Sequence, residues 1–252
     1  MKLTAGAAGY GGLERLPAYQ NVGIPPGFDF LVATHAEVAY KNVGASIGAI
    51  DVERGVKGTL EINQDLVRRG YQGDSWWKGY PLGVATLEAG APGLFTNGSI
   101  WLRGAAGMSP GDREDPFANF YFGGFGNNIL DHGDPKRYRY YYAFPGLELN
   151  EVGGRNFTKA MIDWNLPGLR FRRLGWLDFY ATWARLSIFA NGLVTNLDDE
   201  ASRRSLVGAG AQLDVRFQLF TMQPLTLSGG VARALERDEP PKNEYMISLK
   251  IL

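Results

Sequence analysis

The stretch LVGAGAQLDVRFQL at residues 206–219 decides the fold. From Val207 onward, an apolar residue at every second position alternates with glycine, glutamine, aspartate or arginine. A period of two is that of a β-strand, whose successive side chains point to opposite faces of the sheet. The stretch is also about twice as long as a usual globular strand. One apolar face and one polar or glycine face over this length are typical of a barrel strand with lipid outside and water inside.

The same alternation recurs along the chain. In residues 28–41, Phe28, Phe30 and Val32 begin an apolar face that continues to Tyr40. Clusters of glycine, proline, asparagine and aspartate separate such runs and indicate turns. We therefore expect strands at residues 2–10, 28–41, 45–53, 56–65, 79–90, 97–107, 117–124, 155–165, 176–190, 206–219, 224–235 and 244–252. Together they predict an all-β protein, with one domain over residues 1–252 that forms a transmembrane antiparallel β-barrel of about twelve strands.

A soluble β-sandwich is the alternative fold, because its strands also alternate, with the apolar face turned inward. The length of the strands and the glycine on their polar faces favour the membrane barrel. No run approaches about 18 consecutive apolar residues, so no transmembrane helix is predicted. The opening residues MKLTAG lack the apolar core of a signal peptide. Since an outer-membrane protein must be exported, we expect a mature form or part of a longer chain.

Composition excludes several classes of function. Lys plus Arg equals Asp plus Glu at 26 each, so bulk charge does not indicate a nucleic-acid partner. The absence of cysteine excludes disulfides, thiolate metal sites and a cysteine nucleophile. The chain combines 34 glycines with 13% aromatic residues. This combination is expected where tight inner faces alternate with aromatic girdles at the membrane interface.

The connections in the C-terminal half differ in length. Three polar ones are long and the two between them are short, namely 125–154, 191–205 and 236–243 against 166–175 and 220–223. Outer-membrane barrels have long extracellular loops and short periplasmic turns. We therefore expect loop 125–154 outside and both termini in the periplasm. The link 66–78 is an exception, because it is long on the predicted periplasmic side.

Motifs in residues 95–166 support a family resemblance. SIWLRGAAG at 99–107 is followed by PF at 116–117, FYFGG at 120–124 and, after a long insertion, IDWNLP at 162–167. In this order they resemble the bacterial surface antigen superfamily, which contains outer-membrane barrel-assembly insertases and two-partner secretion translocators. Sixteen strands are usual in that superfamily. The resemblance therefore implies that this chain corresponds to a C-terminal barrel portion.

The resemblance also implies a set of loop-binding residues. In the superfamily the long loop folds back into the barrel, and Asp163 stands at the acidic position of the strand that follows it. The loop motif of the superfamily reads NNILDHG here, at 127–133, so Arg137 or Arg139 is the expected loop partner. Asp214 and Arg216, on the predicted inward face, are further candidates for holding the loop.

Other sequence features carry simpler interpretations. The tyrosines of RYRYYY at 137–142 are interpreted as part of an aromatic girdle, with the arginines directed to lipopolysaccharide or the lumen. Ser46 lies in GASIG, which matches a nucleophile elbow, but no helix follows it. His35 is predicted to face the lumen, and His132 lies in a loop with scattered acids. We therefore predict no catalytic residue, no metal and no cofactor.

These patterns predict a protein of the bacterial outer membrane that acts as a membrane anchor or as a protein assembly or secretion pore. A simple diffusion porin and, less favoured, an outer-membrane hydrolase using Ser46 are the alternatives. The expected partners are outer-membrane lipid, lipopolysaccharide and a periplasmic domain in a longer parent chain, without nucleic acid. The C-terminal residues 244–252 resemble the strand that barrel-assembly machinery reads, although Leu252 replaces the usual aromatic residue.

Overall fold

A computed structural model describes the chain except for residues 14–27, 72–73, 177, 221–222, 238 and 252. The described part is all-β, and its helical segments are the short 3-10 turns η1 (Pro116–Ala118) and η2 (Arg137–Arg139). Among the described residues, no helix is long and apolar enough to span a membrane.

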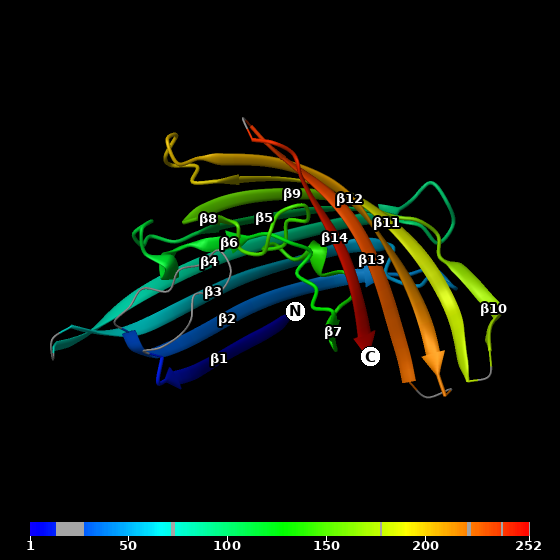
Figure 1. Cartoon of the computed structure of the whole chain (residues 1–252), viewed down its shortest axis with the longest axis horizontal. Coiled ribbons are helices and arrows are strands. Elements are labelled where there is room, and N and C mark those ends of the chain that lie inside the picture. The colour runs from blue at the N-terminus through cyan, green and yellow to red at the C-terminus, as the bar shows by residue number, and fades with distance from the viewer. Residues whose placement is uncertain (14–27, 72–73, 177, 221–222, 238, 252) are drawn as a thin grey trace.

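One curved and twisted sheet contains most of the chain (Figure 1). Its long strands follow one another as antiparallel neighbours in an up-and-down meander. They are β1 (Lys2–Gly11), β2 (Phe28–Gly44), β3 (Arg54–Tyr71), β4 (Asp74–Pro92), β5 (Ser99–Met108), β9 (Asn156–Asn165), β11 (Phe179–Thr195), β12 (Arg204–Leu219), β13 (Gln223–Glu236) and β14 (Lys242–Ile251).

Two smaller strands complete this sheet, which has 12 strands in the described part of the chain. β10 (Leu169–Trp176) pairs with the beginning of β11, and β7 (Leu130–Asp131) runs parallel to the end of β14. A separate two-stranded sheet is formed by β6 (Phe120–Phe122) and β8 (Val152–Gly154). No pairing joins β1 to β14 in the described residues, so β1 is an edge strand and β14 is covered on its outer edge only at Leu249–Lys250, by β7.

The expected number of strands agrees with the sheet, but two of its members differ. Residues 45–53 form a loop between β2 and β3, closed by a backbone hydrogen bond from Glu53 to Gly44. Gly48 in this loop has a φ of 85°, a left-handed conformation that a continuous strand does not use. Residues 117–124 contribute only β6, which lies outside the main sheet, whereas its members β7 and β10 were not predicted.

The expected long link at 66–78 is also wrong. β3 continues to Tyr71 and β4 begins at Asp74, so most of that segment is strand. The connections 109–155, 196–203 and 237–241 lie at one end of the meander, and the connections 45–53 and 93–98 lie at the other. We call the first of these the loop end. Both termini lie at the opposite end, which we call the turn end.

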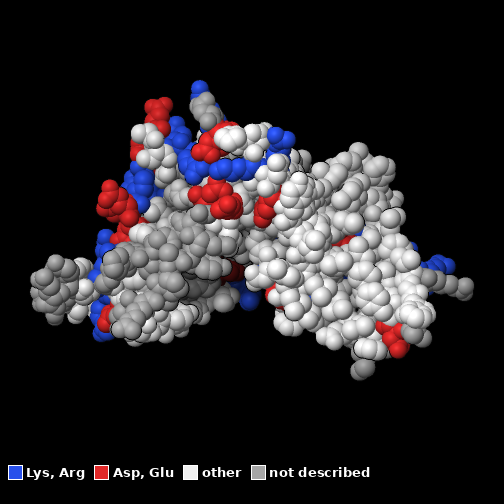
Figure 2. Space-filling model, in the orientation of Figure 1, with Lys and Arg blue, Asp and Glu red and all other residues white. Residues whose placement is uncertain are grey.

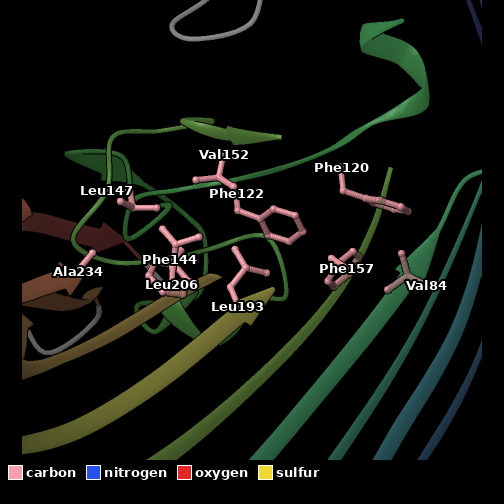
Figure 3. Packing of buried hydrophobic residues seen from close by; sticks show 10 residues of the cluster. All are labelled: Val84, Phe120, Phe122, Phe144, Leu147, Val152, Phe157, Leu193, Leu206 and Ala234. Carbon is pink, nitrogen blue, oxygen red and sulfur yellow. The ribbon is translucent and has the colours of Figure 1, made fainter. Parts of the chain in front are cut away.

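The segment 109–155, between β5 and β9, lies against one face of the sheet (Figure 1). We call this the inner face and the opposite one the outer face. A hydrophobic core fills the space between the segment and the inner face (Figure 3). Its members come from the segment and from the long strands: Val84, Phe120, Phe122, Phe144, Leu147, Val152, Phe157, Leu193, Leu206 and Ala234. The rings of Phe122 and Phe157 lie 4.7 Å apart in an edge contact.

One residue of the expected outer face points the other way. A bulge between Phe28 and Phe30 shifts the register of β2 against β3. Because a bulge adds one residue to a strand of period two, it moves Phe28 to the inner face. Phe28 is 5% exposed there, and its ring lies 5.2 Å from that of Phe117.

Candidate functional site

A polar cluster lies on the inner face of β9, β11 and β12, beneath η2. Strand register brings it together, since Asn165 of β9 faces Ser187 of β11, which faces Gln212 of β12. Asp163 and Asp214 extend the cluster and are 0% and 1% exposed. Buried carboxylates require cationic or hydrogen-bonding partners.

The segment 109–155 supplies those partners through η2. Arg139 Nε lies 2.9 Å from Asp163 Oδ2, and the Tyr138 hydroxyl donates to Asp163 Oδ1 at 3.1 Å. From β5, Arg103 reaches Asp163 Oδ2 at 3.3 Å. Tyr138 also stacks on Phe189 with ring centroids 4.4 Å apart. Asp163 is therefore the point at which β5, β9 and the segment are joined.

Lys136 forms a second contact beside it. Its Nζ donates to Asn165 Oδ1 at 2.9 Å and to Ser187 Oγ at 2.7 Å, and lies 3.8 Å from Asp214 Oδ2. Burial, together with repulsion from Arg139 and Arg185, lowers the pKa of Lys136 well below its usual value. We call Lys136, Tyr138, Arg139, Asp163 and Asp214 the anchor cluster.

Further contacts fix the same segment to β14 and β9. Lys250 of β14 is 0% exposed and its Nζ lies 2.8 Å from Asp131. Near the loop end, Glu244 accepts from the backbone N–H of Phe125 at 3.0 Å and of Gly146 at 2.9 Å. Lys159 of β9 donates to three backbone carbonyls of residues 140–143. The segment is thus attached across much of the inner face.

The first part of the segment is attached to β3 and β4. Asp115, next to η1, accepts from the Tyr80 hydroxyl at 2.5 Å and from Arg69 at 2.7 Å, and Lys78 lies 3.1 Å away. Asp115 is 7% exposed, and its partners come from strands distant in the sequence. No sequence motif identified this contact.

The structure brings some of the sequence-predicted residues together and separates others. Arg139 and Asp163 are paired. Arg137 instead lies 3.0 Å from Asp131 and donates to the Gly126 carbonyl, both within the segment. Asp214 contacts Lys136. Arg216 shares the strand and face of Asp214, but the described residues offer it no ion pair.

The girdle interpretation of residues 137–142 is wrong. Tyr138 is fully buried between the segment and the inner face, and Tyr140 and Tyr142 are 39% and 41% exposed on the inner side. Sequence reasoning also missed Lys136 and Tyr138 as anchoring residues. Their only signal was the mixture of cations and aromatic rings in one short stretch.

The described residues contain no contact between Ser46 and a histidine. The backbone N–H of Ser46 donates to Glu53 at 2.8 Å. His35 Nδ1 lies 2.7 Å from Asn63 Oδ1, and His132 Nδ1 lies 2.9 Å from the Ile251 carbonyl. Among the described residues, no three His, Cys, Asp or Glu side chains are placed together to hold a metal ion.

Fold and site together define an all-β protein in which one curved sheet binds a segment of its own chain on its inner face. Comparison with known proteins finds no matching family model, no matching curated protein and no matching solved structure.

One contact of the anchor cluster is expected to depend on pH. Asp51, in the loop 45–53, lies 3.3 Å from Arg139 and 3.0 Å from Arg185. Burial raises the pKa of its carboxyl, but the two guanidinium groups outweigh this effect and hold the pKa below its ordinary value of 3.8. A lowered pKa contributes stability above the ordinary value, which is lost as the pH falls below it.

We therefore expect Asp51→Asn to unfold at a lower denaturant concentration than the wild type at neutral pH. The difference should shrink as the pH falls below about 3.8. Denaturant titrations of both proteins across this range measure it. A difference that stays constant with pH would show that Asp51 contributes through packing and not through its charge.

Proposed function

We propose that this chain is an outer-membrane β-barrel of the surface antigen type, serving as a membrane anchor or as a protein assembly or secretion pore. In this proposal the segment 109–155 occupies the lumen and closes it to large solutes at rest. The support comes from the two faces of the sheet, from its rims and from the anchor cluster.

The observation that carries the proposal is the reversed polarity of the sheet. Large apolar side chains are exposed on the outer faces of strands across the whole sheet, among them Leu60 at 54%, Ile62 at 55%, Leu102 at 61%, Val207 at 57% and Ile247 at 73%. The space-filling view has broad areas without charged side chains (Figure 2). The charged side chains gather mainly along one edge of this view. On the inner face, by contrast, Asp163, Asp214 and Lys250 are buried. Apolar surface this extensive indicates contact with a membrane or a partner.

Aromatic side chains at both ends of the sheet agree with this reading. Trp76 and Trp77 are about half exposed in the β3–β4 hairpin at the loop end. Trp176 and Phe179, in the β10–β11 hairpin at the turn end, are 82% and 44% exposed. Such rings favour the two membrane–water interfaces.

A membrane barrel requires closure, because an unpaired backbone group in hydrocarbon costs several kcal/mol. The two free edges suit each other. Since each long strand reverses the direction of the one before it, β14 runs antiparallel to β1. We propose that β1 pairs in the membrane with the part of β14 that precedes Leu249, where β7 is paired, which removes the open edges of both strands.

The anchor cluster favours a closed pore over a simple diffusion porin. A porin needs a wide polar lumen, whereas here the inner face binds a segment with its own hydrophobic core and buried ion pairs. A hydrolase needs a serine next to a histidine. Ser46 has no such contact in the described residues.

Conductance in planar bilayers tests the proposal. Deleting residues 125–149 joins β6 to β8, which are already paired from Phe120–Gly154 to Phe122–Val152, and leaves Gly123, Gly124, Asn150 and Glu151 as the turn. Gly124 and Asn150 already have left-handed φ values of 65° and 57°. We expect a small conductance for the wild type and a severalfold larger one for the deletion.

A second variant covers failure of the deletion to fold. Lys136→Gln with Arg139→Gln keeps the segment but removes the two cations of the anchor cluster, and we expect frequent openings. A large wild-type conductance that neither the deletion nor the double substitution alters would favour a porin. A chain that folds but never inserts into the bilayer would refute the barrel.

A further inference from the structure

A cavity of about 480 Å³ lies between the segment and the inner face of β2–β5. One wall is formed by side chains of β2, β3 and β4, including Glu37, Thr59 and Glu61. The opposite wall is the run Tyr140–Tyr142 of the segment. If the sheet closes in a membrane, this cavity is a part of the lumen that the segment leaves unfilled.

The cations that line the cavity already have acceptors. Arg103, 7% exposed, contacts Glu88 and Asp163. Arg139 contacts Asp163, and Lys159, 5% exposed, donates to backbone carbonyls of the segment. These positive groups are therefore already bound to protein acceptors and do not offer their charge to a solute in the cavity.

Two carboxylates lack a Lys or Arg partner among the described residues, although Glu61 accepts a hydrogen bond from the Asn63 amide at 2.6 Å. Glu37 of β2 and Glu61 of β3 stand directly across from each other in the strand register. Their side chains are 31% and 22% exposed, and the ionisable group within ion-pair distance of both in the described residues is the His35 ring, at 3.9 Å and 3.5 Å. That ring is bonded to Asn63 at 2.7 Å. Like charges directly across a strand pair are destabilising unless a cation compensates them.

The facing wall suits a cation as well. Tyr140 and Tyr142 are partly exposed, with ring centroids 5.4 Å apart, and aromatic faces attract cations. Burial, followed by the negative charge of Glu61, raises the pKa of Tyr141 to about 12.

We propose that this cavity is a passage for small cations, with Glu37 and Glu61 as the residues that determine its selectivity. The inference rests on the proposed function, because the cavity becomes an ion path only in a closed membrane barrel. A ring or pair of acidic side chains in a narrow lumen attracts cations and excludes anions.

Reversal potentials in a KCl gradient test the passage. The wild type should pass potassium in preference to chloride, and Glu37→Gln with Glu61→Gln should reduce the permeability ratio by at least roughly threefold, since two nearby charges are lost. Glu37→Asp with Glu61→Asp should keep the preference. Glu114→Gln with Glu200→Gln, which removes two charges from connections at the loop end, is the matched control and should change nothing.

Anion preference, or a ratio that the Gln pair leaves unchanged, would overturn the inference while leaving the barrel intact. If the deletion of residues 125–149 conducts and the wild type does not, the cavity is sealed, and this result too would overturn the inference while leaving the barrel intact. If neither the wild type nor the deletion inserts into the bilayer, the proposed function itself fails.

Discussion

Asp163→Asn is expected to destabilise the folded protein by about 3–5 kcal/mol, because it breaks a buried ion pair and leaves cations uncompensated. Asp163 is 0% exposed, and Arg139 and Arg103 both point to its Oδ2 at 2.9 Å and 3.3 Å. Asparagine has nearly the same shape, so the loss reflects charge and hydrogen bonding and not volume. The free energy of unfolding in urea, measured in lipid vesicles, gives the size of the effect.

Asp29→Asn is the control for this substitution. Asp29 pairs with Arg68 at 2.6 Å, but both side chains are more than a third exposed, and exposed pairs contribute little. We expect almost no change there. Equal effects of the two substitutions would mean that the anchor cluster does not hold the segment.

Ile188→Arg is expected to cost about 2–4 kcal/mol in a membrane, the range for an arginine on the lipid face near the middle of a bilayer. Ile188 lies near the centre of β11, is 40% exposed, and points to the outer face between Trp164 and Ala211 on the neighbouring strands. At an exposed site of a soluble protein the same change is usually within about 0.5 kcal/mol. The predicted effect therefore separates the membrane barrel from a soluble sheet.

Val194→Arg is the matched control, because Val194 lies on the same face of β11 near its loop end. The cost of arginine on the lipid face falls to about 0–1 kcal/mol near the interface. Refolding into vesicles, followed by urea titration, measures both variants. A small, equal effect at the two positions would contradict insertion of this strand into lipid.

Local pattern predicted most of the sheet. β12 and β14 were expected from their alternation, because the side chains of a strand point to opposite faces in any context. The same rule failed at residues 45–53, where small and apolar residues follow one another but Gly48 turns the chain. It also failed at Phe28, because a bulge reverses the faces of the strand there and the alternation of apolar and polar residues does not reveal it.

The sequence predicted only part of the candidate site. Arg137 and Arg139 stand two residues apart with the same chemistry, and the sequence left both open as the partner of Asp163. The 3-10 turn η2 directs Arg139 to Asp163 and Arg137 to Asp131 of the segment itself. That choice depends on how η2 docks against β9 and β11.

The sequence by itself determined that this protein is all-β and which side chains share each face of most strands, because a period of two is a property of neighbouring residues. Only the tertiary structure decided what the inner face binds and which edges stay open. Those features depend on contacts such as Asp115 with Tyr80 and Asp131 with Lys250, between residues far apart in the chain. Such contacts form only after the strands have taken their register, so no local pattern records them.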